Sequence, residues 1–322
     1  MTAWPPSALV LAAGVGARLH PLTLARAKPA VPIAGVPLVG RILRDLAAAG
    51  VRDVVLNLHH RPETIARVVG EGREFGVRVR YTWEPVILGS AGGPRRALPL
   101  LASDPYLLIN GDTLLTVDVR ALWEAHLAHR ARVTMTLIPN PAPERYGGVL
   151  LDEGGWVIGF TRRGDPRPSY HFFSAQVVDH SVFAHLPEGV PAESVLGVYP
   201  EMLRDEPRTI RGFVCDAPFI EVGTPADYLR VQEEVAAAEG TSPWTRGART
   251  SLAESGVVKD SVLWDDVEIG AGAQVERCIL TDGVRIPAGL HVRDAAIVRA
   301  PGIAPRAGER TLDDLLIVPL NR

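Results

Sequence analysis

The sequence predicts an α/β protein with a mixed, mostly parallel sheet flanked by helices, followed by a short C-terminal left-handed β-helix. Two observations predict this. From Ser7 to about Glu239, short aliphatic runs alternate with amphipathic stretches, which is typical of strand-helix-strand crossovers. Beyond residue 255, aliphatic residues recur every six positions, which is typical of a hexapeptide solenoid. We therefore expect one domain over residues 1–240, a linker over 241–254, and the β-helix with its tail over 255–322.

The first part of the chain supplies the strands and helices of a Rossmann-like sheet. Aliphatic runs predict strands over residues 8–13, 53–58, 77–83, 106–109 and 133–138. Apolar residues at helical spacing predict helices over residues 39–49, 62–72, 91–101 and 119–129. Because the two kinds of segment alternate, the strands are expected to run mostly parallel.

The pattern changes after Pro139. Two short runs, 148–151 and 156–160, flank an Asp-Glu-Gly-Gly turn and predict a hairpin, which a strand over 170–178 follows. Helices are expected over 192–203 and 225–238. The next residues are rich in Gly, Thr, Ser and Arg, as in a linker.

The six-residue period predicts a triangular coil in which each face contributes one inward aliphatic side chain. The periodic positions are Val257, Leu263, Ile269 and Val275, then, after a slip of one residue, Leu280, Ile286, Val292 and Val298. Ordinary alternating strands are the alternative. About two coils are expected, and the open end of so short a stack must be covered by the first domain or by a second subunit. The β-helix is therefore predicted to serve packing or homo-oligomerisation.

The composition gives no reason to expect a strongly charged partner. Apolar residues make up 47% and charged residues 22% of the chain, and the net charge of -3 gives no reason to expect nucleic acid or an anionic membrane as partner. Cys215 and Cys278 form no CxxC motif, which argues against a disulfide framework or a cysteine metal site. No run approaches the roughly 18 apolar residues of a membrane span, so a cytoplasmic protein is expected.

A glycine-rich turn follows the first predicted strand, at Gly14-Val15-Gly16-Ala17-Arg18. Glycines there let backbone N–H groups approach phosphate oxygens. The third glycine of a dinucleotide fingerprint and the lysine of a Walker motif are both absent. Instead, Arg18 follows the loop, and Lys28 stands in Ala-Lys-Pro-Ala-Val-Pro, where the prolines are expected to hold an extended segment. Lys28 is one of only two lysines, with Lys259.

Further segments carry chemistry at the ends of predicted elements. Leu88-Gly89-Ser90-Ala91-Gly92 enters a predicted helix, where a glycine lets a flat base lie on the main chain, although a glycine-rich helix start explains it as well. Asn57 ends the second strand and is either a nucleotide contact or a strand-end cap. Asp112 follows a hydrophobic strand through Asn110-Gly111, where open α/β sheets present ligands, and its carboxylate suits Mg²⁺.

Together these segments resemble the sugar-1-phosphate nucleotidyltransferases, also called NDP-sugar pyrophosphorylases. The resemblance rests on Gly-x-Gly-x-Arg-Leu-x-Pro-Leu-Thr, Lys-Pro-x-x-Pro, Leu-Gly-Ser-Ala-Gly, Asn-Gly-Asp, Glu-Arg-Tyr-Gly-Gly-Val and Ile-Glu-Val-Gly-Thr-Pro-Ala-Asp-Tyr-Leu, in order over residues 8–240. It implies that the loop wraps a nucleoside triphosphate, that the arginine neutralises departing pyrophosphate, that the lysine contacts the reacting phosphate, and that Mg²⁺ is the cofactor. The implied residues are Arg18 and Lys28 for catalysis; Ala13, Gly14, Gly16, Asn57, Gly89 and Ser90 for the nucleotide; Glu144, Gly147 and Arg163 for the sugar phosphate; and Asp112 and Glu221 for the metal.

Three positions depart from the family pattern. Glu221 stands where aspartate is usual, and Arg162-Arg163 replaces a Glu-Lys pair that meets the sugar and its phosphate. The segment Phe172-Phe173-Ser174-Ala175-Gln176 stands where many members carry an Asn-x-Gly sugar contact. The Leu-Gly-Ser-Ala-Gly form and the hexapeptide tail look most like mannose-1-phosphate guanylyltransferases, which implies GTP and mannose-1-phosphate. Relatives that use dTTP or UTP with glucose-1-phosphate or another sugar phosphate share these features.

Two other functions compete with an active transferase. A catalytically silent relative that binds a nucleotide-sugar and regulates a partner is favoured by the departures at Glu221, Arg162 and Phe172. A hexapeptide acyltransferase needs more coils than this chain supplies, and only His291 lies within the repeats as a candidate base.

Overall fold

The computed structural model describes residues 4–320, which form two compact units. The first unit contains residues 4–14 and Val39–Ile220, and the second contains Val15–Leu38 and residues 221–320. The break in the chain falls inside the glycine-rich loop, between Gly14 and Val15. The segment that carries Arg18 and Lys28 is therefore grouped with the C-terminal part of the chain, whereas the sequence-based division places a boundary at residue 240.

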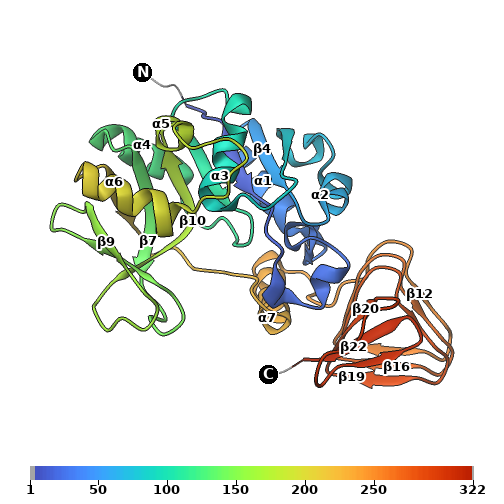
Figure 1. Ribbon diagram of the computed structural model, residues 1–322. Helices are drawn as coiled ribbons and strands as arrows, with labels where there is room; N and C mark the ends of the chain where they lie inside the picture. The colour runs from blue at the N-terminus through green and yellow to red at the C-terminus, as the bar shows by residue number, and fades with distance from the viewer. Residues whose placement is uncertain (1–3, 321–322) are drawn as a thin grey trace. The chain divides into compact units, whose positions relative to one another are not determined.

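The first unit is built on a mixed sheet with strand order β11-β7-β10-β6-β1-β4-β5 (Figure 1). Its strands are β1 (Ala8–Leu11), β4 (Asp53–Leu58), β5 (Arg78–Trp83), β6 (Tyr106–Asn110), β7 (Val133–Pro139), β10 (Tyr170–Val178) and β11 (Ile210–Val214). Strands β6, β1, β4 and β5 run parallel, and β10 is antiparallel to both of its neighbours, β6 and β7. The predicted Rossmann-like, mostly parallel sheet is confirmed.

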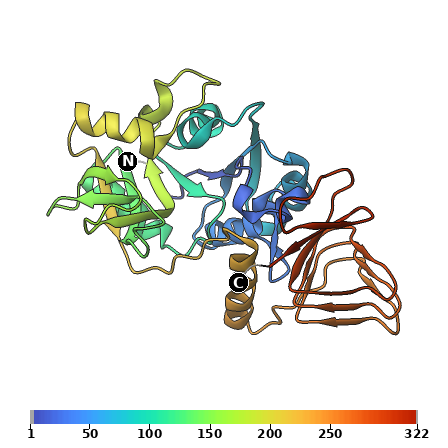
Figure 2. The same ribbon diagram turned by 60° about the horizontal axis from the view of Figure 1, so that its bottom comes forward.

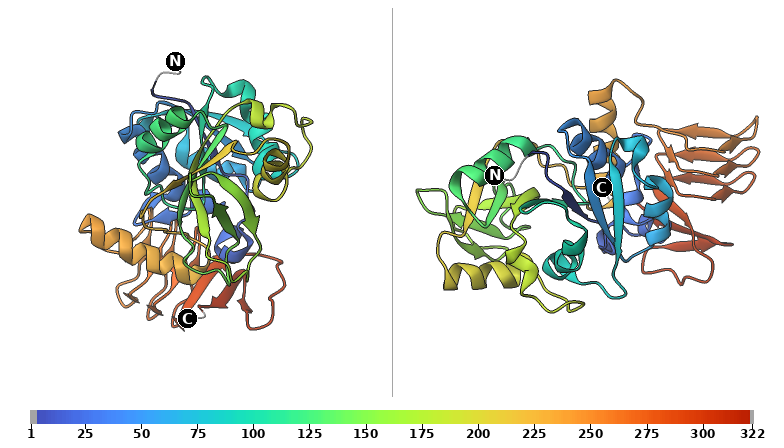
Figure 3. Two further views of the ribbon diagram at one scale, coloured as in Figure 1. Left: turned by 90° about the vertical axis from the view of Figure 1, so that its left-hand side faces the viewer. Right: turned by 90° about the horizontal axis from the view of Figure 1, so that it is seen from above.

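Helices cover this sheet, and all of them except α5 lie in or overlap segments that the sequence predicts to be helical. They are α1 (Leu38–Ala48), α2 (Pro62–Val69), α3 (Gly89–Ala97), α4 (Val119–His129), α5 (Ser181–Ala184) and α6 (Tyr199–Asp205). Figure 3 shows α4 and α6 on opposite faces of the sheet. On the α6 face, strand residues such as Leu9 and Met135 pack against Ala91, Phe183 and Tyr199 from α3, α5 and α6. No helix among residues 4–320 is long and apolar enough to cross a membrane.

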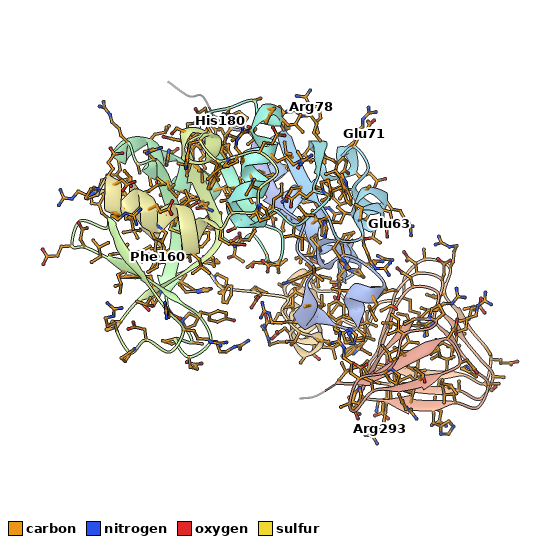
Figure 4. The ribbon with its side chains drawn as sticks, in the orientation of Figure 1. Glu63, Glu71, Arg78, Phe160, His180 and Arg293 are labelled. Atoms are coloured by element: carbon orange, nitrogen blue, oxygen red, sulfur yellow. The ribbon has the colours of Figure 1, made fainter. Side chains whose placement is uncertain are left out.

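The segment after Pro139 forms the predicted hairpin, from β8 (Gly148–Leu151) and β9 (Val157–Thr161). Phe160 of β9 stacks on Tyr199 of α6 with ring centroids 6.5 Å apart, which joins the hairpin to the core (Figure 4). The helix expected over 192–203 starts as a π-helical turn (Ser194–Val198) before α6. Neither α5 nor β11 is predicted from the sequence, because both are short and lack a clear period.

The second unit begins with a compact segment, Val15–Leu38. It contains three 3₁₀ turns, η1 (Ala17–Leu19), η2 (Leu22–Leu24) and η3 (Lys28–Ala30), and a small hairpin of β2 (Pro32–Ile33) and β3 (Val36–Pro37). The extended conformation expected around Lys28 is wrong. Pro29 occupies the second position of a 3₁₀ turn, and its fixed φ suits that turn as well as an extended chain.

Helix α7 (Pro225–Glu239) follows in the second unit. Thr224 caps it, because its side chain accepts the N–H of Asp227 while the Asp227 carboxylate accepts the N–H of Thr224. Gly240, with φ of 65°, ends the helix in the left-handed conformation.

The C-terminal residues form a parallel β-helix with three faces, whose stacked coils are visible in Figure 2. The first face contains β12 (Ser251–Leu252), β15 (Glu268–Ile269) and β18 (Arg285–Ile286); the second contains β13 (Val257–Lys259), β16 (Gln274–Glu276) and β19 (His291–Arg293); the third contains β14 (Val262–Leu263), β17 (Ile279–Leu280) and β20 (Ala295–Arg299). A C-terminal hairpin, β21 (Arg310–Leu312) and β22 (Leu315–Pro319), extends the third face. Strand β12 lies within the range predicted as a linker, 241–254.

The structure corrects the predicted repeat in two respects. There are three coils instead of about two, and equivalent residues of successive coils, such as Ser255 and Gly272, are 17 positions apart. The one-residue slip therefore recurs in every coil. It coincides with a corner at which Asp260, Arg277 and Asp294 adopt φ values of 47°, 50° and 49°, so that one face is a residue shorter.

The recurring slip changes which side chains point inward at the two ends of the repeat. Val257 is 54% exposed, and its neighbour Val258 packs against the coil core instead. At the other end Ile297 lies in that core, whereas Val298 packs outside it against Leu24.

Candidate active site

The carboxyl edge of the central strands brings two predicted residues of the first unit, Asn57 and Asp112, to one edge of the sheet together with Ala12. Strands β4, β1 and β6 are adjacent and parallel, so the residues at their ends, Asn57, Ala12 and Asp112, lie along the same edge. Gly111 makes this possible. Its N–H donates to the Leu11 carbonyl oxygen at 3.0 Å, and a Cβ at this position would lie only 2.2 Å from that oxygen. The turn that carries Asp112 therefore lies against the start of the glycine-rich loop.

Asn57 connects this loop to the segment that precedes α3. It is 2% exposed, its Oδ1 accepts the N–H of Ala12 at 2.8 Å, and its Nδ2 donates to Oε1 of Glu84 at 2.7 Å. Glu84 is fully buried, and its Oε2 accepts the N–H of Leu88 at 2.9 Å. Both polar atoms of the Asn57 side chain thus hold backbone elements of the site in place. Sequence reasoning missed Glu84, because nothing in its local pattern shows that it is buried.

The N-terminus of α3 is covered by a neighbouring segment of the chain. A Cβ at Gly89 would lie 2.6 Å from the Ala192 carbonyl oxygen and 2.6 Å from Oε1 of Glu193. Ser90 Oγ donates to Oε2 of Glu193 at 2.6 Å and accepts the N–H of Ser194 at 2.8 Å. The glycine requirement at position 89 therefore has a packing cause in this structure. The Glu193 carboxylate, which the sequence analysis did not identify, interacts favourably with the positive end of the helix.

The three predicted sugar-phosphate residues, Glu144, Gly147 and Arg163, belong to two adjacent segments. A Cβ at Gly147 would lie 2.8 Å from the Thr161 carbonyl oxygen, and the N–H of Gly164 donates to the Pro143 carbonyl oxygen at 2.8 Å. Residues 143–148 therefore run along the end of β9. Glu144 and Arg163 are both exposed on this part of the surface.

An aromatic group beside these segments was not predicted. Tyr146, His171 and Phe219 contact one another with ring centroids 4.5, 4.8 and 5.6 Å apart, and Phe173 lies 5.8 Å from Phe219. The guanidinium of Arg145 lies 5.4 Å from the Tyr146 ring centre. These rings come from separate parts of the sequence, so only the folded chain shows that they form one partly exposed surface.

Ser174 marks an irregularity in β10, the strand that carries His171. The strand shifts register between Phe172 and Gln176, and Ser174 has a φ of 61°. Its hydroxyl is buried and has no hydrogen-bond partner among the residues that the structure describes. A non-glycine residue in the left-handed backbone region and a buried hydroxyl without a partner each raise the free energy of the folded state. Such features are more typical of functional sites than of structural positions.

In the second unit, Lys28 packs directly against the glycine-rich loop. Gly16 has a φ of 64°, and a Cβ there would lie 3.1 Å from Lys28 Cβ and 3.1 Å from Thr23 Cγ2. Both its conformation and its close neighbours require glycine at position 16. Gly14, by contrast, has open space around it. The side chain of Lys28 is largely buried, with the residue 6% exposed.

Arg18 and Glu221 are joined in this structure, although the resemblance gives them different partners. Arg18 Nη2 donates to Oε1 of Glu221, and the two side chains are 57% and 12% exposed. Gly223 makes room for the pair, because a Cβ there would lie 3.1 Å from Nη1 of Arg18. Within residues 4–320, no three or more His, Cys, Asp or Glu side chains form a group that could hold a metal ion.

Comparisons with known proteins agree on one family. A model described as nucleotidyl transferase matches residues 7–236, and one described as a GlmU-like C-terminal hexapeptide matches residues 247–296. The mannose-1-phosphate guanylyltransferase of Mycobacterium tuberculosis is 31% identical over 292 residues, which cover 88% of this chain and 81% of that protein. The D-glycero-alpha-D-manno-heptose 1-phosphate guanylyltransferase of Aneurinibacillus thermoaerophilus is 30% identical over 230 residues, covering 71% of this chain and 97% of that protein.

A solved structure supports the fold of the first part of the chain. HddC from Yersinia pseudotuberculosis, complexed with GMP-PN, superimposes with a TM-score of 0.61 and 23% identity, covering 71% of this chain and 99% of that one.

Proposed function

Because the chain belongs to the nucleotidyl transferase family, and its relatives there are sugar-1-phosphate nucleotidyltransferases, we propose that its substrates are GTP and mannose-1-phosphate. The observation that carries the proposal is the likeness to the mycobacterial mannose-1-phosphate guanylyltransferase, which extends through the hexapeptide region. The heptose-1-phosphate guanylyltransferase supports the same nucleobase with a different sugar.

The proposed reaction is a single displacement at the α-phosphorus of the triphosphate. An oxygen of the sugar-1-phosphate forms a bond to that phosphorus, the bond to the β-phosphate oxygen breaks, and pyrophosphate leaves. No protein base is required, because the attacking phosphate is already ionised. Catalysis is then alignment of the two phosphates and neutralisation of charge, which we assign to Arg18 and Lys28. Amides of Ala13, Gly14 and Gly16 would hold the triphosphate.

We assign the remaining contacts by the geometry of each unit. Gly89 and Ser90 would meet the nucleobase through the α3 N-terminus, while Asn57 would orient the loop through Ala12. Glu144, Gly147 and Arg163 would receive the sugar phosphate beside the aromatic group of Tyr146, His171 and Phe219. The buried hydroxyl of Ser174 is the natural candidate for a further contact, because it has no partner in the described part of the chain.

Asp112 and Glu221 are the proposed ligands of Mg²⁺. The donor set fits, because Mg²⁺ in nucleotide enzymes is held by one or two carboxylates together with substrate phosphates and waters. The side chain of Glu221, 12% exposed, pairs with the Arg18 guanidinium, which supports a role for this carboxylate in holding positive charge. When bound, the ion would neutralise triphosphate charge. Asp112 and Glu221 would hold the ion, and Arg18, which contacts Glu221 in this structure, would contact the triphosphate.

A pyrophosphate-release panel tests the proposal. Each of the four common ribonucleoside triphosphates and dTTP is mixed with mannose-, glucose- and heptose-1-phosphate in the presence of Mg²⁺. The highest kcat/KM is expected for GTP with mannose-1-phosphate, and a higher value for another pair would overturn the substrate assignment. No release with any pair would favour the catalytically silent, nucleotide-sugar-binding relative.

Two variants test the residue assignments within that reaction. Lys28→Ala and Asp112→Ala are expected to keep the circular dichroism spectrum of the parent and to lose most turnover, on the order of 100-fold or more, because each removes charge stabilisation at the reacting phosphates. A near-parental rate in either variant would contradict its role.

The β-helix is also proposed to support a homo-oligomer, as hexapeptide repeats expose parallel coil edges that a second copy can cover. Size-exclusion chromatography with light scattering tests this, and a monomer at micromolar concentration would contradict it.

A further inference from the structure

The segment Val15–Leu38, which carries Arg18 and Lys28, is fastened to the β-helix by a buried ionic cluster. Its centre is Arg26, which is only 8% exposed. Arg26 Nε and Nη2 donate to the two carboxylate oxygens of Asp282 at 2.7 and 2.6 Å, and Nη2 also donates to Asp265 at 2.7 Å. Asp265 and Asp282 occupy equivalent positions, 17 residues apart, on successive coils. One guanidinium therefore joins two coils of the β-helix to the segment Val15–Leu38, which we call the catalytic segment after the proposed roles of Arg18 and Lys28.

The surroundings of Arg26 hold it in a single orientation. Its guanidinium carbon lies 5.2 Å from the ring centre of Trp264, which is 1% exposed, and Trp264 Nε1 donates to the buried hydroxyl of Tyr228 on α7 at 3.1 Å. Burial acts to lower the pKa of Arg26, but the hydrogen bonds and charges of Asp282 and Asp265 outweigh it and raise the pKa. The arginine is thus permanently charged, and both Nε and Nη2 are used in binding the coils.

Two further contacts fasten the same segment on either side of Arg26. Leu24 packs against Val298 and Leu316 on the outside of the third face of the β-helix. His20 Nε2 lies 2.9 Å from Oε1 of Glu309, in the loop between β20 and β21. The backbone from residue 20 to residue 26 is therefore attached to the β-helix at three points.

Arg26 is close in sequence and in structure to the predicted catalytic groups. Lys28 follows it by two residues and opens the turn η3, and the side chain of Lys28 forms one wall of the space around Gly16. A movement of Arg26 would be passed to Lys28 through one intervening residue, Ala27, which is fully buried. Displacing a positioned group by about 1 Å can reduce a rate on the order of 100-fold.

We propose that Arg26 is a positioning residue for the transfer reaction, and that the β-helix, through Asp265 and Asp282, is the base on which Arg18 and Lys28 are aligned for the triphosphate. The proposal rests on the proposed function of Lys28, and it gives the β-helix a role within each subunit in addition to any role between subunits. Arg18 and Lys28, which we assign to the triphosphate, belong to the same unit as Arg26, whereas the residues assigned to the sugar phosphate belong to the other unit, so the effect is directed at the triphosphate.

The test uses full-length Arg26→Met, which keeps the contact with Trp264 but removes the charge and the hydrogen bonds. With GTP, mannose-1-phosphate and Mg²⁺, at a temperature where circular dichroism shows a folded protein, we expect kcat/KM for GTP to fall about 10- to 100-fold. KM for mannose-1-phosphate is expected to stay within about twofold, since the positioning acts on the triphosphate side. Arg26→Lys, which keeps the charge without the bidentate geometry, is expected to restore part of the loss.

A second variant and a matched control keep the result interpretable. Asp282→Asn leaves Arg26 and the catalytic segment unchanged and alters only the β-helix, and it is expected to raise KM for GTP in the same direction as Arg26→Met. Arg249→Met breaks a similar coil-bridging pair, with Asp266, in which both side chains are exposed. Its kinetic constants are expected to match the parent.

The outcomes separate this inference from the proposed function. If Arg26→Met and Asp282→Asn lower the melting temperature but keep kcat and KM for GTP within twofold of Arg249→Met, the cluster is only structural and the inference is overturned. If Arg26→Met does not fold, the kinetics of Asp282→Asn decide by the same criterion. If Lys28→Ala retains parental turnover, the proposed role of Lys28 fails, whatever the Arg26 variants do.

Discussion

Gly111 illustrates how one residue without a side chain determines the position of a charged neighbour. The turn after β6 passes so close to β1 that a Cβ would overlap the Leu11 carbonyl oxygen. The turn that carries Asp112 can therefore lie against the start of the glycine-rich loop only if residue 111 is glycine. A substitution here acts on the site through the backbone.

Gly111→Ala is expected to lower the free energy of unfolding by about 2–4 kcal/mol, because the added methyl group is overpacked and the Gly111–Leu11 hydrogen bond is displaced. Urea denaturation measures the change. Gly14→Ala is the control, since open space surrounds that position, and its effect on stability is expected to stay within about 0.5 kcal/mol. Equal stabilities for the two variants would contradict the close approach of the turn.

The two thiols differ in environment and should differ in reactivity. Cys278 is fully buried in the β-helix, and burial raises its pKa to about 11, so its thiol stays protonated at pH 8. Cys215 is only partly buried. In a reaction with Ellman's reagent at pH 8, one thiol per native chain is expected to react rapidly and the second only after denaturation. Cys215→Ser should remove the rapid phase, and two equally rapid thiols would rule out this assignment.

At the scale of elements, the β-helix shows that a six-residue repeat in the sequence does not by itself determine the length of each coil or which side chains point inward. A six-residue spacing predicts the coil, but the tight corner at Asp260, Arg277 and Asp294 makes each turn 17 residues long. Near the ends of the repeat, positions of the six-residue spacing that should point into the coil core therefore point outward. Val257 and Val275 share one phase of the six-residue spacing, yet Val257 is 54% exposed and Val275 is 1% exposed.

This difference can be measured with two identical substitutions. Val275→Ala is expected to lower the free energy of unfolding by about 2 kcal/mol, because it removes buried methyl groups and leaves a cavity. Val257→Ala, the matched control, is expected to change it by less than about 0.5 kcal/mol. Guanidinium denaturation compares them. Similar losses in both variants would support the uninterrupted six-residue phase and contradict the 17-residue coil.

At the scale of the whole molecule, the second unit combines the catalytic segment, α7 and the β-helix. Ending the chain at Gly240 would take away Trp264, Asp282 and Leu316, and so expose Tyr228, Arg26 and Leu24 in the remaining part. The shortened chain is expected to aggregate, or to remain folded without the rise in melting temperature that we expect GTP with Mg²⁺ to produce in the full chain. Light scattering and differential scanning fluorimetry measure the two results. A monodisperse shortened chain with a full GTP-dependent shift would show that the catalytic segment does not need the β-helix.

Much of this architecture could be predicted, because it is encoded in local patterns. The strand over 53–58 and the helix over 119–129 have the predicted bounds, since uninterrupted aliphatic runs and helical apolar spacing leave few alternatives. The glycine-rich turn, the Asn-Gly-Asp turn and the hexapeptide period indicated the family in the same way, and the comparisons confirm it.

The site is less predictable, because its support comes from residues that no local pattern marks. The sequence leaves Asn57 as either a nucleotide contact or a strand-end cap. The structure shows that its side chain hydrogen-bonds to the Ala12 N–H and to the Glu84 carboxylate. Glu193 and the aromatic group around Phe219 were not predicted, because their contacts depend on which distant segments pack beside them. The proposed roles of Lys28, Asp112 and Glu221 remain predictions that the kinetic experiments address.

The sequence by itself determined the order of the elements, the family and the residue types available for phosphate chemistry, because periodicity and short motifs depend on neighbours within a few positions. Only the tertiary structure decided that Val15–Leu38 belongs with the β-helix. Arg26 and Asp282 are 256 positions apart, and the free energy of their contact depends on a buried geometry that exists only after the coils have formed.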